Sequence, residues 1–273
     1  MKFARSTRTV LWMTTLAAVG CKKVEPAPKA LDRLFPYFFT MIDEGSDEDL
    51  AYGIRELHKE KSLEEGEDLL DGSISKLNKS DLQVVGLNDR DPSKAAGVFL
   101  VNKIECSFSQ LEKILYHKHQ DQLYDGVYDT YNRAYTSDKD AYINRDTMEL
   151  TWDLDYEATI VGKTYRSDVK GKLRRVPNLG EEETPHGAFL VTRAYLPRPA
   201  DFESGNTSLD QDYQIEMYYK LGGGQILHAY GVWREADFGG NLTSDHEGTQ
   251  RLLLNSMADW DADTEKLCEE GRP

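Results

Sequence analysis

The segment 151–174 constrains the fold of this 273-residue chain more than any other segment. Apolar and polar residues alternate along it twice, on either side of Gly162-Lys163. The first inward set is Trp152, Leu154, Tyr156, Ala158 and Ile160, and the second is Tyr165, Ser167, Val169, Gly171 and Leu173. A period of two residues is typical of a β-strand with one buried face, and Gly-x is a common two-residue turn. The segment therefore predicts an antiparallel hairpin that packs on a core by one face.

The charges on the other face of this hairpin predict its register. Folding about Gly162-Lys163 puts Trp152 opposite Leu173 and Asp155 opposite Lys170. Opposite charges then meet on the solvent face, where each cross-strand pair contributes about 0.2–1 kcal/mol. A slip by one residue would turn the apolar set toward solvent, so we expect the two faces to be fixed.

Other strands and helices surround the hairpin. The further candidate strands are 97–106, 189–196, 213–221 and 225–233, and a short helix is expected from Ser107. Before them, residues 31–96 are acidic and show helical periodicity, and Ser46 and Asp49 have the spacing of a capping box. We interpret 31–96 as a helical extension and 97–273 as the main domain.

A long amphipathic helix is predicted at the C-terminus. Ser244 and Glu247 have capping-box spacing and mark its expected start. Its apolar stripe is Leu253, Met257, Trp260, Thr264 and Leu267, with spacings of four and three. Such spacings place the stripe on one helix face, so the helix should cover the apolar face of a sheet.

The order of these elements resembles the START-like, or helix-grip, superfamily over residues 97–270. The resemblance implies an α+β fold in which a curved antiparallel sheet wraps a long C-terminal helix and leaves an apolar cavity between them. Other antiparallel α+β sheets with a covering helix would show much the same pattern.

The resemblance also implies a set of cavity residues. Those that we expect to bind a ligand are Trp152, Tyr156, Tyr165, Tyr230, His228 and Trp233. Two interpretations of His228 stay open, a satisfied core histidine and a polar anchor in the cavity. Aromatic residues on strands are also commonly plain core.

The N-terminus carries an apparent export signal. Basic residues precede an apolar stretch at 10–19 that is too short to span a bilayer permanently. Ala18-Val19-Gly20-Cys21 resembles the lipobox of bacterial lipoproteins, although Ala18 stands where that motif usually has Leu. The resemblance implies a signal peptide at 1–20, lipid on Cys21 and a tether at 21–30. The alternative is an ordinary signal peptide, or a buried apolar segment, with an incidental cysteine.

Lipidation would fix the location of the chain. Each buried CH₂ contributes about 0.8 kcal/mol, so several acyl chains, palmitate among them, anchor a protein stably. By resemblance to lipoprotein sorting, Lys22 after the cysteine implies the outer membrane of a Gram-negative cell, facing the periplasm. Two other cysteines, Cys106 and Cys268, are an even pair in an exported chain. Both a disulfide and two buried free thiols stay open.

Composition and motifs exclude several classes of function. A net charge of −15 disfavours a nucleic-acid partner, and a mean hydropathy of −0.62 disfavours a polytopic membrane protein. No common catalytic, nucleotide or metal motif occurs, so we predict no enzyme, no cofactor and no metal. The acidic positions Asp259, Asp261, Asp263 and Glu270 fit a calcium loop in spacing, but Thr264 replaces its turn glycine, which favours a solvated helix face.

Two functional hypotheses follow. The first is an envelope lipoprotein that binds a hydrophobic or amphiphilic ligand between sheet and helix. The alternative is a structural or assembly lipoprotein that acts through protein contacts and binds no ligand. An interface without a cavity of a few hundred Å³ would exclude the first hypothesis.

Overall fold

The structure is a computed structural model that describes residues 26–59, 69–160, 162–180, 184, 187–203, 206–240 and 242–273. The predicted signal peptide, Cys21 and the first part of the tether lie outside these residues. Within them, no helix combines the length and the apolar character needed to cross a membrane.

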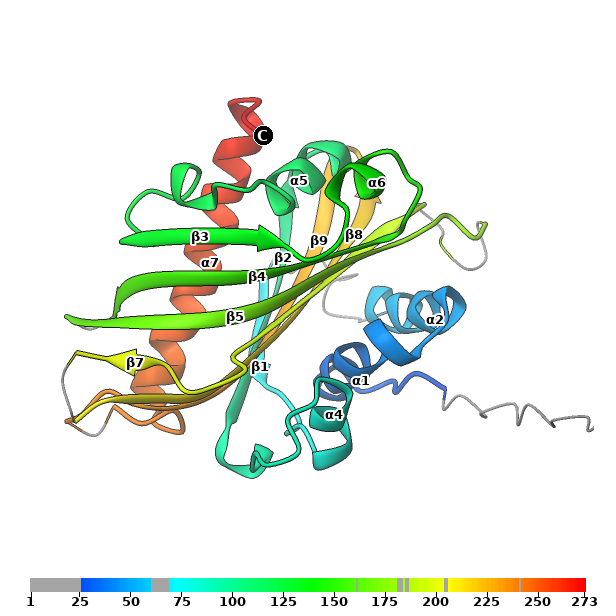
Figure 1. Cartoon of the computed structure of the whole chain (residues 1–273). Helices are drawn as coiled ribbons and strands as arrows, with labels where there is room; N and C mark the ends of the chain where they lie inside the picture. The colour runs from blue at the N-terminus through cyan, green and yellow to red at the C-terminus, as the bar shows by residue number, and fades with distance from the viewer. Residues whose placement is uncertain are drawn as a thin grey trace, which may run out of the picture.

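The core of the molecule is a nine-stranded antiparallel sheet (Figure 1). Its strand order is β1-β2-β9-β8-β6-β5-β4-β3, and β7 pairs with β5 beside this path. The strands are β1 Leu69–Ser73, β2 Ala96–Glu105, β3 Thr130–Tyr135, β4 Glu149–Ile160, β5 Lys163–Val176, β6 Phe189–Tyr195, β7 Asp201–Phe202, β8 Ser208–Gly222 and β9 Gln225–Asp237. The four predicted strands beyond the hairpin are present as β2, β6, β8 and β9.

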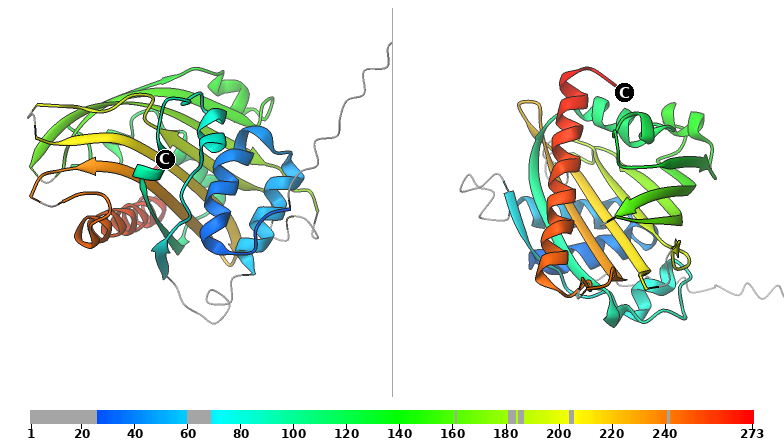
Figure 2. Two further views of the ribbon diagram at one scale, coloured as in Figure 1. Left: turned by 90° about the horizontal axis from the view of Figure 1, so that it is seen from below. Right: turned by 90° about the vertical axis from the view of Figure 1, so that its left-hand side faces the viewer.

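Helices cover both faces of the sheet. The helices are α1 Leu31–Glu44, α2 Asp47–His58, α4 Lys79–Val84, α5 Phe108–Leu115, α6 Lys139–Ile143 and α7 Glu247–Glu269, with 3₁₀ turns at Pro92–Lys94 and Gln120–Gln122. In the right-hand view of Figure 2, α7 crosses in front of the sheet while α1 and α2 lie behind it. We call the α7 side, which carries Tyr230, the inner face, and the α1 side, which carries Trp233, the outer face. The predicted α+β fold, a curved antiparallel sheet on a long C-terminal helix, is confirmed.

The outer face holds a large apolar core. Phe35, Phe38, Phe39 and Ile42 of α1 are all fully buried and pack with α2 and the sheet. Ser46 forms the predicted capping box with Asp49 at the start of α2. This core explains why the acidic N-terminal region folds at all, because its apolar stripe has a sheet to cover.

The region 31–96 also contributes a strand, which the sequence prediction did not include. β1 pairs antiparallel with β2, with Asp71 opposite Leu100. The strand is short and holds Gly72, whose missing Cβ leaves room for the ring of Phe99. Its weak apolar pattern explains why alternation did not reveal it.

The register of the central hairpin differs from the predicted one by two residues. Ile160 pairs with Lys163, so Lys163 belongs to β5 rather than to the turn, and Gly162 has a φ of 70°. Trp152 consequently lies opposite Gly171, not Leu173. Because the shift is an even number, every side chain keeps its predicted face.

The covering of the outer face fixes the orientation of β8. Its apolar residues Tyr213, Ile215, Met217 and Tyr219 face α1 and α2 in the outer core. The alternate positions therefore face α7, and Asp212, Gln214 and Glu216 among them are polar. The sequence analysis had assigned the apolar face of the sheet to α7 alone.

A disulfide and a buried stripe attach α7 to the sheet. Met257, Thr264 and Leu267 of the predicted stripe are buried. Cys106, just after β2, is bonded to Cys268 near the end of α7, with a Cα–Cα distance of 5.4 Å. The predicted start of α7 is wrong, since His246, rather than Ser244, caps the helix through the backbone N–H of Gly248.

Candidate functional site

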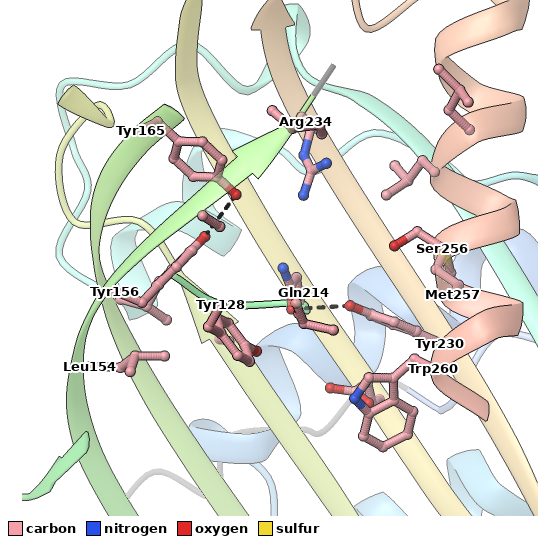
Figure 3. A pocket seen from close by; sticks show the side chains of 18 of the residues that line it. Tyr128, Leu154, Tyr156, Tyr165, Gln214, Tyr230, Arg234, Ser256, Met257 and Trp260 are labelled. Atoms are coloured by element: carbon pink, nitrogen blue, oxygen red, sulfur yellow. Dashed lines mark hydrogen bonds between the residues drawn. The ribbon is translucent and has the colours of Figure 1, made fainter. Parts of the chain in front are cut away.

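A cavity of about 780 Å³ lies between the inner face of the sheet and α7. Figure 3 shows Tyr156 and Tyr165 on one side of it, and Met257 and Trp260 of α7 on the other. The volume is within the range of small-molecule sites, about 300–1,000 Å³. The condition set by the ligand-binding hypothesis, a cavity between sheet and helix, is therefore met.

Aromatic residues of β4 and β5 form one wall of the cavity. Trp152, Tyr156 and Tyr165 line it, and the hydroxyls of Tyr156 and Tyr165 are 3.3 Å apart. Burial raises the pKa of Tyr156 well above its ordinary value, so its hydroxyl stays protonated. A Cβ on Gly171 would lie 2.1 Å from the indole of Trp152, so the ring keeps its place because this position is glycine.

The middle of the sheet gives the cavity a polar floor. The polar residues come from neighbouring strands β8 and β9. Tyr230 donates to Gln214 at 3.1 Å, and Arg234 donates to Asp212 at 2.6 Å. Burial also raises the pKa of Tyr230 well above its ordinary value. The site thus combines an apolar wall with convergent polar groups, the usual composition of a small-molecule site.

A buried histidine joins this floor to α7. The side chain of His228 is fully buried, and its ring nitrogens lie 2.6 Å from Asp261 and 3.2 Å from Glu216. Burial disfavours the charged ring, but the two carboxylates outweigh it and raise the pKa of His228 to about 9. Asn102 of β2 donates to Asp261 at 3.0 Å. The imidazolium is therefore held between two carboxylates from different elements.

The structure brings most of the predicted ligand residues together. Trp152, Tyr156, Tyr165 and Tyr230 all line the cavity. His228 lies on the same face, but both of its nitrogens are already paired, as expected of a satisfied core histidine.

Two of the sequence predictions for this part of the molecule are wrong. Trp233 lies in the outer core and donates to the carbonyl oxygen of Ser75 at 2.9 Å. Trp233 is an odd number of residues from Tyr230, and two such residues on one strand point to opposite faces of the sheet. Asp261 does not lie on a solvated helix face, because it is 1% exposed and pairs with His228.

Sequence reasoning missed the polar positions of β8 and an arginine on β3. Asp212, Gln214 and Glu216 have a period of two, which was a usable signal for one face of a strand. Arg133 also lines the cavity, from a strand that the sequence analysis did not predict. Among the described residues, no group of three or more His, Cys, Asp or Glu side chains could hold a metal ion.

Comparisons with known proteins give structural likeness at low identity. No protein-family model matches the sequence, and no curated protein matches it. The human StAR-related lipid transfer protein 5 is similar in structure at a TM-score of 0.43 and 9% identity, over 81% of this chain and 97% of that chain. The lipid transfer and protein localization domain of human StarD13 gives 0.41 and 10%, over 81% and 96%.

A bacterial structure is similar to the same degree. A START superfamily protein from Mycobacterium smegmatis gives a TM-score of 0.40 and 11% identity, over 64% of this chain and 97% of that chain. With TM-scores below 0.5, these likenesses carry no argument about function. The function proposed below rests on the cavity of this chain.

Proposed function

We propose that this chain is an envelope lipoprotein, anchored through Cys21 at the outer membrane and facing the periplasm, whose cavity binds a hydrophobic or amphiphilic ligand. The cavity of about 780 Å³ carries the proposal. Its wall is aromatic and apolar, and its polar groups converge from β8 and β9, so it suits a ligand with a large apolar part and a small polar part.

The disulfide supports the exported location. Cys106 and Cys268 are bonded, and disulfides persist mainly in oxidising compartments such as the periplasm. The lipobox-like sequence before Cys21 supports the anchor. A Cys21→Ser variant should lose its attachment to membranes on cell fractionation, while the parent chain pellets with them. Membrane attachment of the variant equal to that of the parent would contradict the anchor.

Ligand binding is tested by native mass spectrometry of the Cys21→Ser chain. We expect an apolar molecule to be retained and then released by organic solvent. A second substitution, Ser256→Trp, should abolish this retention, because Ser256 lines the cavity from α7 (Figure 3). Its exposure keeps the expected cost in stability within about 0.5 kcal/mol.

The matched control is Asn255→Trp. Asn255 is the exposed neighbour of Ser256 on α7, so the same ring is added outside the cavity and retention should be unchanged. Absence of any retained molecule, together with no binding of added palmitate, would refute the ligand-binding proposal. The alternative, a structural lipoprotein that acts through protein contacts, would then be the better account.

A further inference from the structure

Arg133 lines the cavity without an anionic partner among the residues that the structure describes. It lies on β3 opposite Leu154 of β4 and is only 5% exposed. Its Nη1 donates to the carbonyl oxygens of Leu115 at 2.9 Å and His117 at 3.3 Å. Its Nε is buried and lacks a hydrogen-bond partner within the described part of the chain.

Other arginines in and around the core are paired with carboxylates. Arg175 pairs with Glu112, Arg193 with Asp43 and Arg234 with Asp212. Arg133 is the exception among the buried arginines of the described ranges. The fold thus neutralises its buried guanidinium groups elsewhere and leaves one charge uncompensated beside the cavity.

The surroundings of Arg133 stabilise its charge only in part. Its Cζ lies 4.6 Å from the ring centroid of Trp152 and 5.6 Å from that of Tyr131, and such contacts contribute modestly. The nearby phenols do not supply an anion, because burial raises the pKa of Tyr131 above its ordinary value and that of Tyr128 to about 12. The guanidinium itself does not lose its proton in proteins.

A buried charge without a counter-ion is costly, and an oxyanion in the cavity would remove that cost. Arginine binds carboxylates and phosphates through paired N–H groups. We propose that the ligand is an anionic amphiphile whose single carboxylate or phosphate group pairs with Arg133. This inference rests on the proposed function and names the chemical class of its ligand.

The remaining lining accommodates the apolar part of such a ligand. From Leu154, opposite Arg133, the cavity follows β4 through Ala158 to Ile160. The six steps from Leu154 to Ile160 cover about 20 Å. Leu253 and Met257 of α7 line the same cavity. The anionic group of the ligand therefore lies beside Arg133, and its alkyl part extends along β4 toward Ile160.

Calorimetric titration of the Cys21→Ser chain, stripped of bound molecules, tests the inference. The probes are palmitate, the fatty alcohol of equal chain length, and palmitoyl lysophosphatidic acid. We expect at least one of the two anions to bind about 10- to 100-fold more tightly than the alcohol, which is the range for a charge-assisted hydrogen bond. The anion that binds more tightly identifies the carboxylate or the phosphate as the recognised group.

Variants of Arg133 separate charge from shape. Arg133→Met should remove the preference for anions and leave binding of the alcohol unchanged, whereas Arg133→Lys should keep part of the preference. The ligand-free Arg133→Met chain should melt no lower than the parent, because a buried uncompensated charge is removed. Arg166→Met is the matched control, since Arg166 is exposed and pairs with Asp155 at 2.6 Å on the solvent face.

The outcomes distinguish the two proposals. Equal affinity of the parent chain for the alcohol and both anions would overturn the role of Arg133 and leave the proposed function intact. Equal loss of alcohol and anion binding in Arg133→Lys would also overturn it, since the residue would then support only the shape of the cavity. Failure of all three probes to bind the parent would refute ligand binding itself, and this inference with it.

Discussion

Removal of His228 should change how the stability of this protein depends on pH. The ring is fully buried between Asp261 of α7 and Glu216 of β8, and its pKa is raised from 6.5 to about 9. The folded state therefore binds this proton more tightly than the unfolded chain does. The stabilisation is complete below about pH 6.5 and is lost as the pH rises through about 9.

The size of the effect follows from the two pKa values. A tenfold change in proton affinity is about 1.4 kcal/mol, so the rise from 6.5 to about 9 corresponds to about 3 kcal/mol of unfolding free energy. At about pH 9.5 only a few tenths of a kcal/mol remain. Part of this free energy comes from the pair between Asp261 of α7 and the histidine of β9, which joins the helix to the sheet.

Urea denaturation without reductant measures the effect. The free energy of unfolding of the parent chain and of His228→Gln is compared at about pH 6 and about pH 9.5. The stability advantage of the parent should shrink by about 3 kcal/mol over this interval. The control is His119→Gln, the same substitution at a ring that is 52% exposed. An advantage for the parent over His228→Gln that is the same at both pH values would refute the reasoning.

Three further substitutions test the fold around the cavity. Replacing Cys106 and Cys268 by serine should cost up to about 5 kcal/mol in unfolding free energy, the loop-closure value for a separation of 162 residues, as measured by urea denaturation. Gly171→Ala should lower the melting temperature, because the new Cβ would lie 2.1 Å from the ring of Trp152, with a cost of about 1–3 kcal/mol. Trp233→Phe should cost about 1–2 kcal/mol through its lost hydrogen bond and leave ligand affinity unchanged in calorimetry, since the residue is on the outer face.

Each of these three predictions has a result that would contradict it. Equal stability of the disulfide-free and parent chains would mean that the bond adds nothing to the attachment of α7. Combining Gly171→Ala with Trp152→Leu should recover stability relative to the sum of the single effects, and simple additivity would argue against the steric explanation. Weaker ligand binding by Trp233→Phe would place its ring near the cavity, against the structure.

The alternation of apolar and polar residues predicted the strands and their faces, because the side chains of successive strand residues always point to opposite faces. The faces of β4 and β5 were therefore predicted correctly although their pairing was wrong by two residues. The register depended on the loop, and Gly162 fits either position in a two-residue loop. Whether Cys106 and Cys268 are bonded was left open, because sequence does not give the distance between them, and the structure shows the bond.

Which element covers which face was not predictable in the same way. The sequence analysis placed every aromatic residue that it selected on the α7 side, but α1 and α2 bury the opposite face. Trp233 was misplaced for this reason, although its parity relative to Tyr230 pointed outward. Arg133 was missed because β3 is short and is mixed in composition. The cavity could thus be anticipated as a feature of the fold, while its polar groups depended on tertiary contacts.

Because helices cover both faces of the sheet, one face can be a packed core while the other holds the cavity. The large aromatic residues of α1 and their partners on the sheet form one continuous apolar core on the outer face. The α7 side can consequently leave space unfilled and hold ionic groups without unfolding the molecule. Exposed residues that line the cavity on this side, such as Ser256, are therefore the natural place to engineer a new binding preference.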